Sequence, residues 1–453
     1  MKTIIEGNSK IKKLLGKQRM KDTAYRVMKY VLRTECEDGL LLYNVITSQM
    51  VLLNVDDIPA ITSSFGTNFE VKRELIEAYY LVPDFFDERT LVKQLRVLLR
   101  KLSSSTGING YTILTTTNCN ARCFYCYEAD FPKINMDETT ADHLVDYMLK
   151  HKGSGGLRLS WFGGEPLLHS KRIDQICERL IREGVQFGST MISNGFLFTE
   201  EMIQRAVSIW KLKKVQITLD GTELIYNRTK AYVVQIDSPY QRVMKNIGML
   251  LENGIRVSIR LNLDQHNAED LKQLIDELYD RFGYSEKMDV YSHVLFENQG
   301  YAPIRRTDVA AADLYSKQIS INTHLEAIGL LKRQLSLPSL KKNCCMADGL
   351  GSVCVFPDGQ LFKCEHTGAS DVFGHIDTGI DHEENIEKYQ KTVEMECCVD
   401  CPLYPSCILL EACNGLKDHN TFTCSEDVAS YARAVRSVYT RKKIGDFQKK
   451  LDR

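Results

Sequence analysis

Hydrophobic and polar positions follow two periods along the middle of the chain. Short, apolar, β-branched runs predict strands, and amphipathic segments of helical period lie between them. The strand candidates are residues 111–116, 157–162, 190–193, 215–219, 256–263 and 288–296. Strands that alternate with helices predict a parallel sheet wrapped by helices. Six such units suit a partial (β/α) barrel, so the fold class is α/β. The first intervening helix is expected to begin at Asn135, because Glu138 follows three residues later as in a capping box.

The first hundred residues show a different pattern and contain no metal-binding motif. Residues 30–53 predict two strands joined at the Glu37-Asp38-Gly39 turn. Helical stripes follow over residues 71–80 and 88–102, and the polar stretch 103–110 predicts a linker. We therefore expect an N-terminal domain in which a hairpin precedes helices.

Beyond the barrel the pattern is mostly helical up to residue 343, and residues 344–424 then contain most of the cysteines. Among the cysteines, a hairpin is expected to turn at Pro357-Asp358-Gly359, and residues 426–443 predict a terminal helix. The expected parts of the chain are residues 1–108, 109–300, 301–343 and 344–453.

Composition narrows the possible functions. The 453 residues include 58 basic and 59 acidic side chains, so charge gives no argument for binding nucleic acid or an anionic membrane. No run of apolar residues is long enough for a spanning helix, and the first residues lack a signal-peptide core. We expect a cytoplasmic location with no nucleic-acid or membrane partner. Fifteen cysteines in such a chain favour metal binding over a disulfide framework.

Three of these cysteines lie in one short loop after the first barrel strand. Cys119, Cys123 and Cys126 are separated by three and then two residues, and the next cysteine is Cys177. Thiolates hold iron–sulfur clusters, usually four to a cluster. Three ligands would leave one iron open to a substrate or cofactor. A structural zinc loop is the alternative, although such sites normally close with four ligands.

This spacing, with Tyr125 before the last cysteine, resembles the cluster motif of radical S-adenosylmethionine (SAM) enzymes. The resemblance implies that SAM chelates the open iron through its amino and carboxylate groups. It also implies cleavage of SAM to a 5′-deoxyadenosyl radical that abstracts hydrogen, with Tyr125 near the adenine. The family's core fold is a partial (β/α)6 barrel. Active sites in such barrels lie at the carboxyl ends of the strands, where the cysteine loop falls.

Companion motifs follow at later strand ends. Gly163-Gly164-Glu165-Pro166 resembles the family's GGEP motif, which contacts the SAM amino group, and paired glycines allow close backbone approach. Ser193 and Asn194 resemble a segment that helps to seat the SAM ribose.

The next strand end has its own set of polar residues. Thr218 and Asp220 resemble the family's SLDG segment, and the downstream YNRTK stretch resembles one whose arginine pairs with the SAM carboxylate. This chain offers both Arg228 and Lys230 for that role. Arg260 and Asn262 are expected either to face the pocket or to fill the barrel core.

The later cysteines resemble the SPASM extension, which holds two auxiliary [4Fe-4S] clusters. The resemblance assigns one cluster to Cys398, Cys401, Cys407 and Cys424. It assigns the other to Cys345, Cys364 and Cys413, although five residues rather than the usual three separate Cys407 from Cys413. Cys354 either completes this second set or leaves one iron open. The doublets Cys344–Cys345 and Cys397–Cys398 leave the ligating thiol ambiguous, and a pair of zinc ribbons is the alternative.

The combined resemblance implies three [4Fe-4S] clusters, SAM and a reductant such as flavodoxin or ferredoxin. The hairpin and helices of residues 1–108 resemble winged-helix-like domains that capture a leader peptide at a sheet edge. We therefore expect a maturase of ribosomally made peptides that forms a cysteine thioether. One alternative is a formylglycine-forming sulfatase-maturating enzyme, in which Glu365 would act as base. A non-enzyme iron–sulfur carrier or zinc scaffold is the other.

Overall fold

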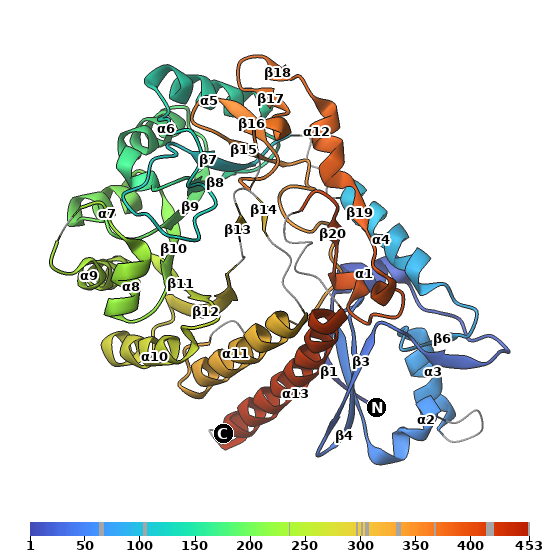
Figure 1. Cartoon of the computed structure of the whole chain (residues 1–453). Helices are drawn as coiled ribbons and strands as arrows, with labels where there is room; N and C mark the ends of the chain where they lie inside the picture. Colours follow the sequence, from blue (N-terminus) through green and yellow to red (C-terminus); the bar gives the residue numbers. More distant parts are fainter. Residues whose placement is uncertain are drawn as a thin grey trace.

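The computed structural model describes most of the chain. The described residues are 1–62, 68–102, 107–234, 236–295, 298–299, 302–303, 308–331, 337–366, 368–413 and 421–451. Residues 103–106 of the expected linker and residue 296 of the last expected barrel strand lie outside these ranges. Figure 1 shows a curved sheet with helices along its outer side. The cysteine-rich region (residues 344–453) and the N-terminal domain lie beside this sheet.

Six parallel strands form the barrel and confirm the predicted α/β class. Each strand pairs in parallel with the next strand along the chain. They are β7 (Gly110–Leu114), β8 (Leu157–Phe162), β9 (Phe187–Ser193), β10 (Leu212–Leu219), β11 (Arg256–Leu263) and β12 (Met288–Val294). The helices between them are α5 (Glu138–His151), α6 (Ser170–Arg182), α7 (Glu200–Ser208), α8 (Glu223–Lys230), α9 (Pro239–Glu252) and α10 (Ala268–Phe282).

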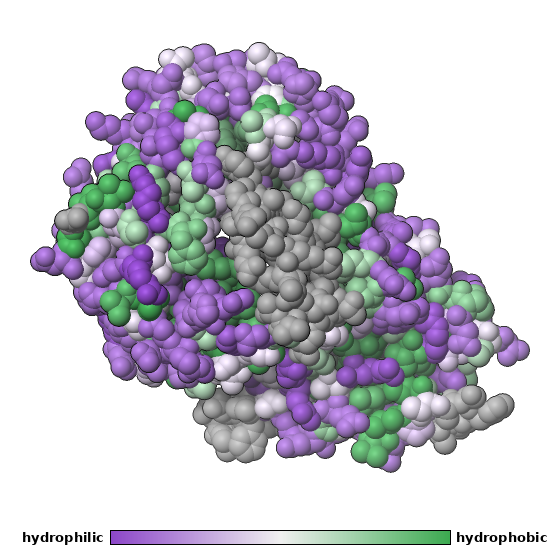
Figure 2. Space-filling view, in the orientation of Figure 1, coloured by the Kyte–Doolittle hydropathy of each residue, from purple (hydrophilic) through white to green (hydrophobic). Residues whose placement is uncertain are grey.

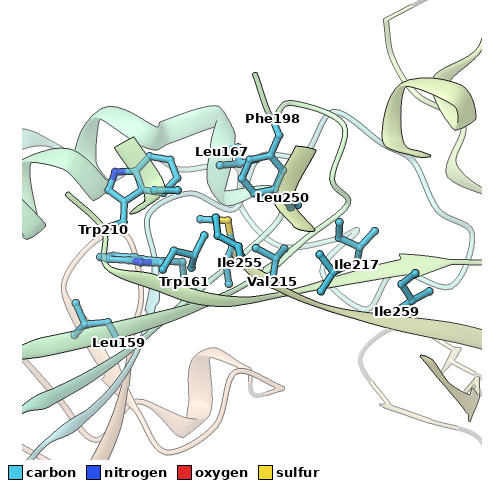
Figure 3. Packing of buried hydrophobic residues seen from close by; sticks show 14 of the residues in the cluster. Leu159, Trp161, Leu167, Phe198, Trp210, Val215, Ile217, Leu250, Ile255 and Ile259 are labelled. Atoms are coloured by element: carbon cyan, nitrogen blue, oxygen red, sulfur yellow. The ribbon is translucent and has the colours of Figure 1, made fainter. Parts of the chain in front are cut away.

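The barrel core lies between the strands and these outer helices. Trp161 of β8 and Val215 and Ile217 of β10 are fully buried against helix-borne side chains, as Figure 3 shows. The side chains that alternate with these along the strands point to the other face of the sheet, and several of them, such as Gln216 and Arg260, are polar. The inner face of the curved sheet is therefore the polar one, which suits a binding site.

The predicted start of the first barrel helix is wrong by two residues. Asp137, not Asn135, is the N-cap of α5, and its side chain accepts a hydrogen bond from the Thr140 amide at 2.7 Å. The Asn135 side chain instead accepts a hydrogen bond from the Thr116 hydroxyl at 2.6 Å. It therefore braces the strand end that precedes the cysteine loop.

The N-terminal domain contains more strands than the sequence pattern predicts. Its antiparallel sheet has the order β1-β5-β4-β3, and the expected turn after residue 36 joins β3 to β4. The strands are β1 (Lys2–Ile5), β3 (Val31–Cys36), β4 (Gly39–Asn44) and β5 (Gln49–Leu53), with a separate pair β2 (Tyr25–Val27) and β6 (Leu81–Pro83). The helices are α1 (Ser9–Leu15), α2 (Pro59–Thr62), α3 (Phe69–Glu77) and α4 (Glu88–Leu102). One sheet face packs on α1, α3 and α4.

The cysteine-rich region is joined to both other parts. Strand β15 (Ser352–Val355) pairs in parallel with β7 and so extends the barrel sheet, and its expected hairpin partner is β16 (Gln360–Phe362). The remaining strands are β13 (Asn298–Gln299), β14 (Ala302–Pro303), β17 (Gly374–His375), β18 (Gly379–Ile380), β19 (Thr392–Val393) and β20 (Leu409–Leu410). The remaining helices are α11 (Asp308–Ala327), α12 (Glu383–Glu387) and α13 (Thr421–Leu451).

The terminal helix α13 covers the second face of the N-terminal sheet. Val435 and Tyr439 of α13 pack with Leu32, Leu41 and Tyr43 of that sheet. Polar residues predominate over the barrel helices in the view of Figure 2. Among the helices that the structure describes, none is long and apolar enough to cross a bilayer.

Candidate active site

The cysteine loop begins where β7 ends and is anchored on both sides. The Thr117 hydroxyl donates to the Pro132 carbonyl at 2.5 Å. The Arg122 amide donates to the Lys230 carbonyl, and the Val233 amide donates to the Asn120 carbonyl, each at 2.8 Å. The loop is therefore fixed between the first strand and the segment that includes helix α8.

The three thiols of this loop lie close enough to influence one another's ionisation. The pKa of Cys119 is raised to about 12, mainly by burial and also by the charges of Glu165, Cys123 and Cys126. Burial also raises the pKa of Cys126. Thiolates that are costly to form in this buried loop are stabilised when they bind a cationic centre. Within the described ranges, no three His, Cys, Asp or Glu side chains are arranged to hold a single metal ion.

The paired glycines approach the backbone of the cysteine loop. A Cβ on Gly163, which has a φ of +112°, would lie 2.2 Å from the Thr116 carbonyl oxygen, and one on Gly164 would lie 2.3 Å from that of Asn118. The Glu165 amide donates to this Asn118 carbonyl at 2.8 Å. The glycines therefore let the second strand end touch the segment that leads into Cys119.

We expect Gly164→Ala to destabilise the protein by about 1–3 kcal/mol, because the new methyl group overlaps backbone that cannot move without shifting the loop. The matched control is Gly188→Ala on strand β9, where a Cβ would meet nothing within 4 Å. Thermal unfolding of both variants measures the difference. Equal melting temperatures would show that the loop tolerates the displacement.

Glu165 links the GGEP segment to the third strand end. Its carboxylate is completely buried and accepts from the Ser193 hydroxyl at 2.8 Å, the Asn194 amide at 2.8 Å and the Leu167 amide at 3.2 Å. Burial raises its pKa to about 7, and these hydrogen bonds oppose the rise. The Asn194 side chain also donates to Asn120 Oδ1 at 2.7 Å. These predicted SAM contacts therefore lie together around the cysteine loop.

Tyr125, Asp220 and Lys230 form a buried polar cluster beside the cysteine loop. The Tyr125 hydroxyl donates to Asp220 Oδ1 at 2.8 Å, and Lys230 Nζ lies 3.0 Å from both that hydroxyl and Asp220 Oδ2. Burial alone would lower the pKa of Lys230, but the Asp220 and Tyr125 charges hold it well above its usual value. Arg228 is exposed on the same helix. Of the two basic residues of YNRTK, the structure therefore places Lys230 at the site.

Several buried polar atoms at the inner face have no hydrogen-bond partner within the described residues. They are Asn120 Nδ2, Arg260 Nε and Asn262 Oδ1. The Asn262 amide nitrogen donates to Asp220 Oδ1 at 2.9 Å, and Arg260 lies beside Thr218 in the β10–β11 register. Unpaired buried polar atoms are costly unless a ligand satisfies them. Thiol, amide and guanidinium groups at one barrel end thus fit an iron–sulfur cluster with a polar, zwitterionic ligand.

Besides Asn120, the structure adds four residues that the sequence analysis did not single out. The His366 ring packs against Tyr127 with ring centroids 4.1 Å apart. Burial lowers the pKa of His366, the Glu365 charge opposes this effect, and the Arg260 charge adds to it. Burial raises the pKa of Glu128 to about 7, and the Glu365 charge also raises it. His293 Nδ1 lies 3.0 Å from Arg260 Nη2. The signal for three of them was adjacency, because Tyr127 and Glu128 directly follow Cys126 and His366 follows Cys364-Glu365.

The later cysteines lie in two groups. Five of them line one small cavity near β19 and β20, and these are Cys397, Cys398, Cys401, Cys407 and Cys424. In the other group, the pKa of Cys364 is raised to about 12, mainly by burial. The charges of Cys345 and Cys413 contribute to this rise. A hydrogen bond with the Cys344 thiol lowers the pKa of Cys345.

Cys354 is placed differently from these thiols. It is completely buried on β15, in an apolar cluster with Phe131, Phe356 and Phe362. Burial raises its pKa well above the usual value, and the Glu365 and Cys364 charges add to the rise. Its surroundings are those of a core side chain that lies near, but not among, the group of Cys345, Cys364 and Cys413.

Part of the chain is similar to a known protein family. Residues 113–278 match the profile of the Radical SAM superfamily. The chain is 39% identical over 80 residues to the pyruvate formate-lyase-activating enzyme of Staphylococcus epidermidis, a match that covers 16% of this chain and 31% of that relative. The chain thus spans about a third of that relative's length. The match spans the cysteine loop and most of the barrel, so this part of the chain is similar to radical SAM enzymes.

Two solved structures share the fold. One is native anSMEcpe with bound AdoMet and Cp18Cys peptide, with a TM-score of 0.56, 15% identity and coverage of 73% of this chain and 99% of that one. The other is Streptococcus suis SuiB bound to precursor peptide SuiA, with a TM-score of 0.51, 14% identity and coverage of 85% and 94%. The likeness in fold extends beyond the residues of the family match.

Proposed function

We propose that the chain is a radical SAM maturase of a ribosomally made peptide, with a SPASM extension and two auxiliary [4Fe-4S] clusters. The observation that carries this proposal is the division of the cysteines into three spatial groups. One group lies at the carboxyl end of the barrel strands, and two lie in the cysteine-rich region. An electron carrier has no need of the polar inner face beside the first group.

The site residues have distinct roles in this proposal. Cys119, Cys123 and Cys126 hold the first cluster, which together with SAM supplies a hydrogen-abstracting radical. Asn120, Asn194 and Asn262 present polar atoms to the SAM zwitterion and ribose. Tyr125 lies against the adenine, and Lys230 is the cation for the carboxylate. The protein's own task is to hold one substrate hydrogen near this end of the barrel and to exclude water.

A peptide substrate is supported by the architecture of the N-terminal domain. Strands β1 and β3 are the edges of its described sheet, and an extended leader peptide can add to such an edge. The two structural neighbours above were solved with peptides. A flavodoxin- or ferredoxin-type reductant in the cytoplasm completes the proposed set of partners.

Thioether formation is the reaction that we favour. Cys345, Cys364 and Cys413 form a three-thiol group while Cys354 packs in the apolar core. Three ligands would leave one auxiliary iron free for the substrate thiolate. Closing the bond removes one hydrogen from the thiol and one from the acceptor carbon. One hydrogen atom goes to the radical, the thiol proton goes to a base, and the remaining electron goes to a cluster.

We expect Cys354→Ala to retain all its iron and its cross-linked product, because this thiol fills the core. The matched control is Cys177→Ala, which removes an equally buried thiol from the barrel core. Iron content and product mass, measured on the same preparations, test the expectation. Loss of about one cluster's iron from Cys354→Ala alone would make it a ligand and remove the vacant site.

Formylglycine formation is the second candidate, and the position of Glu365 favours it. This residue follows Cys364 directly, and its charge raises the pKa of the nearby Glu128. A peptide product that has lost its cysteine sulfur would support this candidate. A product that keeps sulfur and lacks two hydrogens would support the thioether.

A further inference from the structure

Helix α4 carries a stripe of basic residues that faces away from its own domain. Arg89, Lys93, Arg96 and Arg100 follow one another at spacings of four, three and four, which place them on one side of a helix. The opposite side contributes Val92 and Leu95 to the N-terminal core. Figure 1 shows α4 alongside β19 and β20 of the cysteine-rich region.

Arg96 holds the loop of the cysteine group near β19 and β20. Its Nη2 atom donates to the carbonyl oxygens of Tyr404 at 2.6 Å and Cys407 at 2.8 Å. Its Nε atom donates to the Lys341 carbonyl at 3.3 Å. Arg96 also lines the same cavity as the five cysteines of that group.

Aromatic packing fixes the position of the Arg96 side chain. Its guanidinium lies 5.0 Å from the centre of the Tyr404 ring. The Tyr30 ring stacks on Tyr404 at 5.8 Å, and the Tyr404 hydroxyl donates to Glu394 at 2.7 Å. Glu394 in turn pairs with Arg89 and Lys93 of the stripe. The charge is therefore held in one place beside the cysteines.

Arg100 reaches the other cysteine group in the same way. Its Nε atom donates to the Lys342 carbonyl at 2.7 Å, and its Nη2 atom donates to Asp348 at 3.3 Å. The Asp348 carboxylate accepts the amides of Cys344 at 2.9 Å and Cys345 at 3.1 Å. One helix of the N-terminal domain thus supports the loops of both groups.

We propose that Arg96 is a positioning residue for the auxiliary cluster held by Cys401, Cys407 and Cys424 with a thiol of the Cys397–Cys398 doublet. In this arrangement α4 is a structural part of both auxiliary sites. A fixed cation beside an iron–sulfur cluster stabilises its more negative, reduced state, so it raises the reduction potential. The arginine fork also holds the Cys407 loop closed over the cluster. This inference rests on the auxiliary clusters of the proposed function.

The test uses a full-length background in which Cys119, Cys123 and Cys126 are all alanine, so that only auxiliary clusters remain. We expect Arg96→Met to lower the reduction potential of one cluster in an electron-paramagnetic-resonance titration. It should also lose that cluster's iron to a chelator at least several-fold faster. Arg96→Lys keeps the charge and should hold the potential, but it breaks the fork and should also lose iron faster.

Lys93→Met is the matched control, because it removes one charge from the same stripe but contacts Glu394 instead of a cysteine loop. Unchanged potential and chelation rate in Arg96→Met would overturn the inference, as would an equal change in Lys93→Met. If Arg96→Met does not fold, the chelation rate of Arg96→Lys decides, and an unchanged rate overturns it. A background protein without auxiliary iron would contradict the proposed function instead.

Discussion

Replacing Cys119, Cys123 and Cys126 together by alanine is expected to abolish SAM cleavage and to remove about a third of the iron, or about four atoms per chain. The three thiols lie in the loop at the polar end of the barrel. Without them the reducing centre and the anchor for SAM are both lost. The measurements are the iron content of anaerobically prepared protein and the 5′-deoxyadenosine formed after reduction.

Cys177→Ala is the control for this triple variant, because it removes a buried barrel thiol that lies in the hydrophobic core. It should keep both the iron and the cleavage activity. Full iron content in the triple variant would show that these cysteines hold no cluster. Undiminished 5′-deoxyadenosine formation would place the SAM chemistry elsewhere.

Replacing Lys230 by methionine is expected to destabilise the protein by about 3–5 kcal/mol. The change leaves the buried Asp220 carboxylate without its cation, and breaking one side of a buried pair has a cost of this order. Asp220 and Lys230 are each almost fully enclosed, so water cannot replace the lost partner. Urea unfolding followed by circular dichroism measures the loss.

Arg228→Met is the matched control, because it removes a basic residue that is exposed on the same helix. It should change stability by no more than about 0.5 kcal/mol. The double variant with Asp220→Asn should be less destabilised than the sum of the single changes, since it removes the unpaired charge. Equal effects of Lys230→Met and Arg228→Met would contradict the assignment of Lys230 to the site.

Much of the barrel was predictable because β-branched runs and helical stripes mark its elements locally. Strands β8 and β11 match their predicted bounds. The third strand of the N-terminal sheet was missed because its turn contains no glycine; instead Ser48 adopts a φ of 56°. Pairing between β15 and β7 joins residues more than two hundred positions apart, and no local pattern encodes such a contact.

The site was predictable where spacing alone defines the chemistry, as in the cysteine loop. The choice between Arg228 and Lys230 depends on the phase of α8, whose buried face includes Tyr226 and Lys230 at a spacing of four. That spacing was a usable signal. The contact of Arg96 with Cys407 was not, because the two residues lie 311 positions apart in the chain. Long-range packing, which the sequence pattern does not contain, decides such contacts.

Metal analysis of the anaerobically prepared protein, with its visible absorption spectrum, tests the proposed set of clusters most directly. Three cubane clusters predict about twelve irons per chain and broad charge-transfer absorption that bleaches on reduction. Addition of SAM to the reduced protein should then yield 5′-deoxyadenosine. Stoichiometric zinc without visible absorption would contradict the account, because the three cysteine groups would then be structural zinc sites.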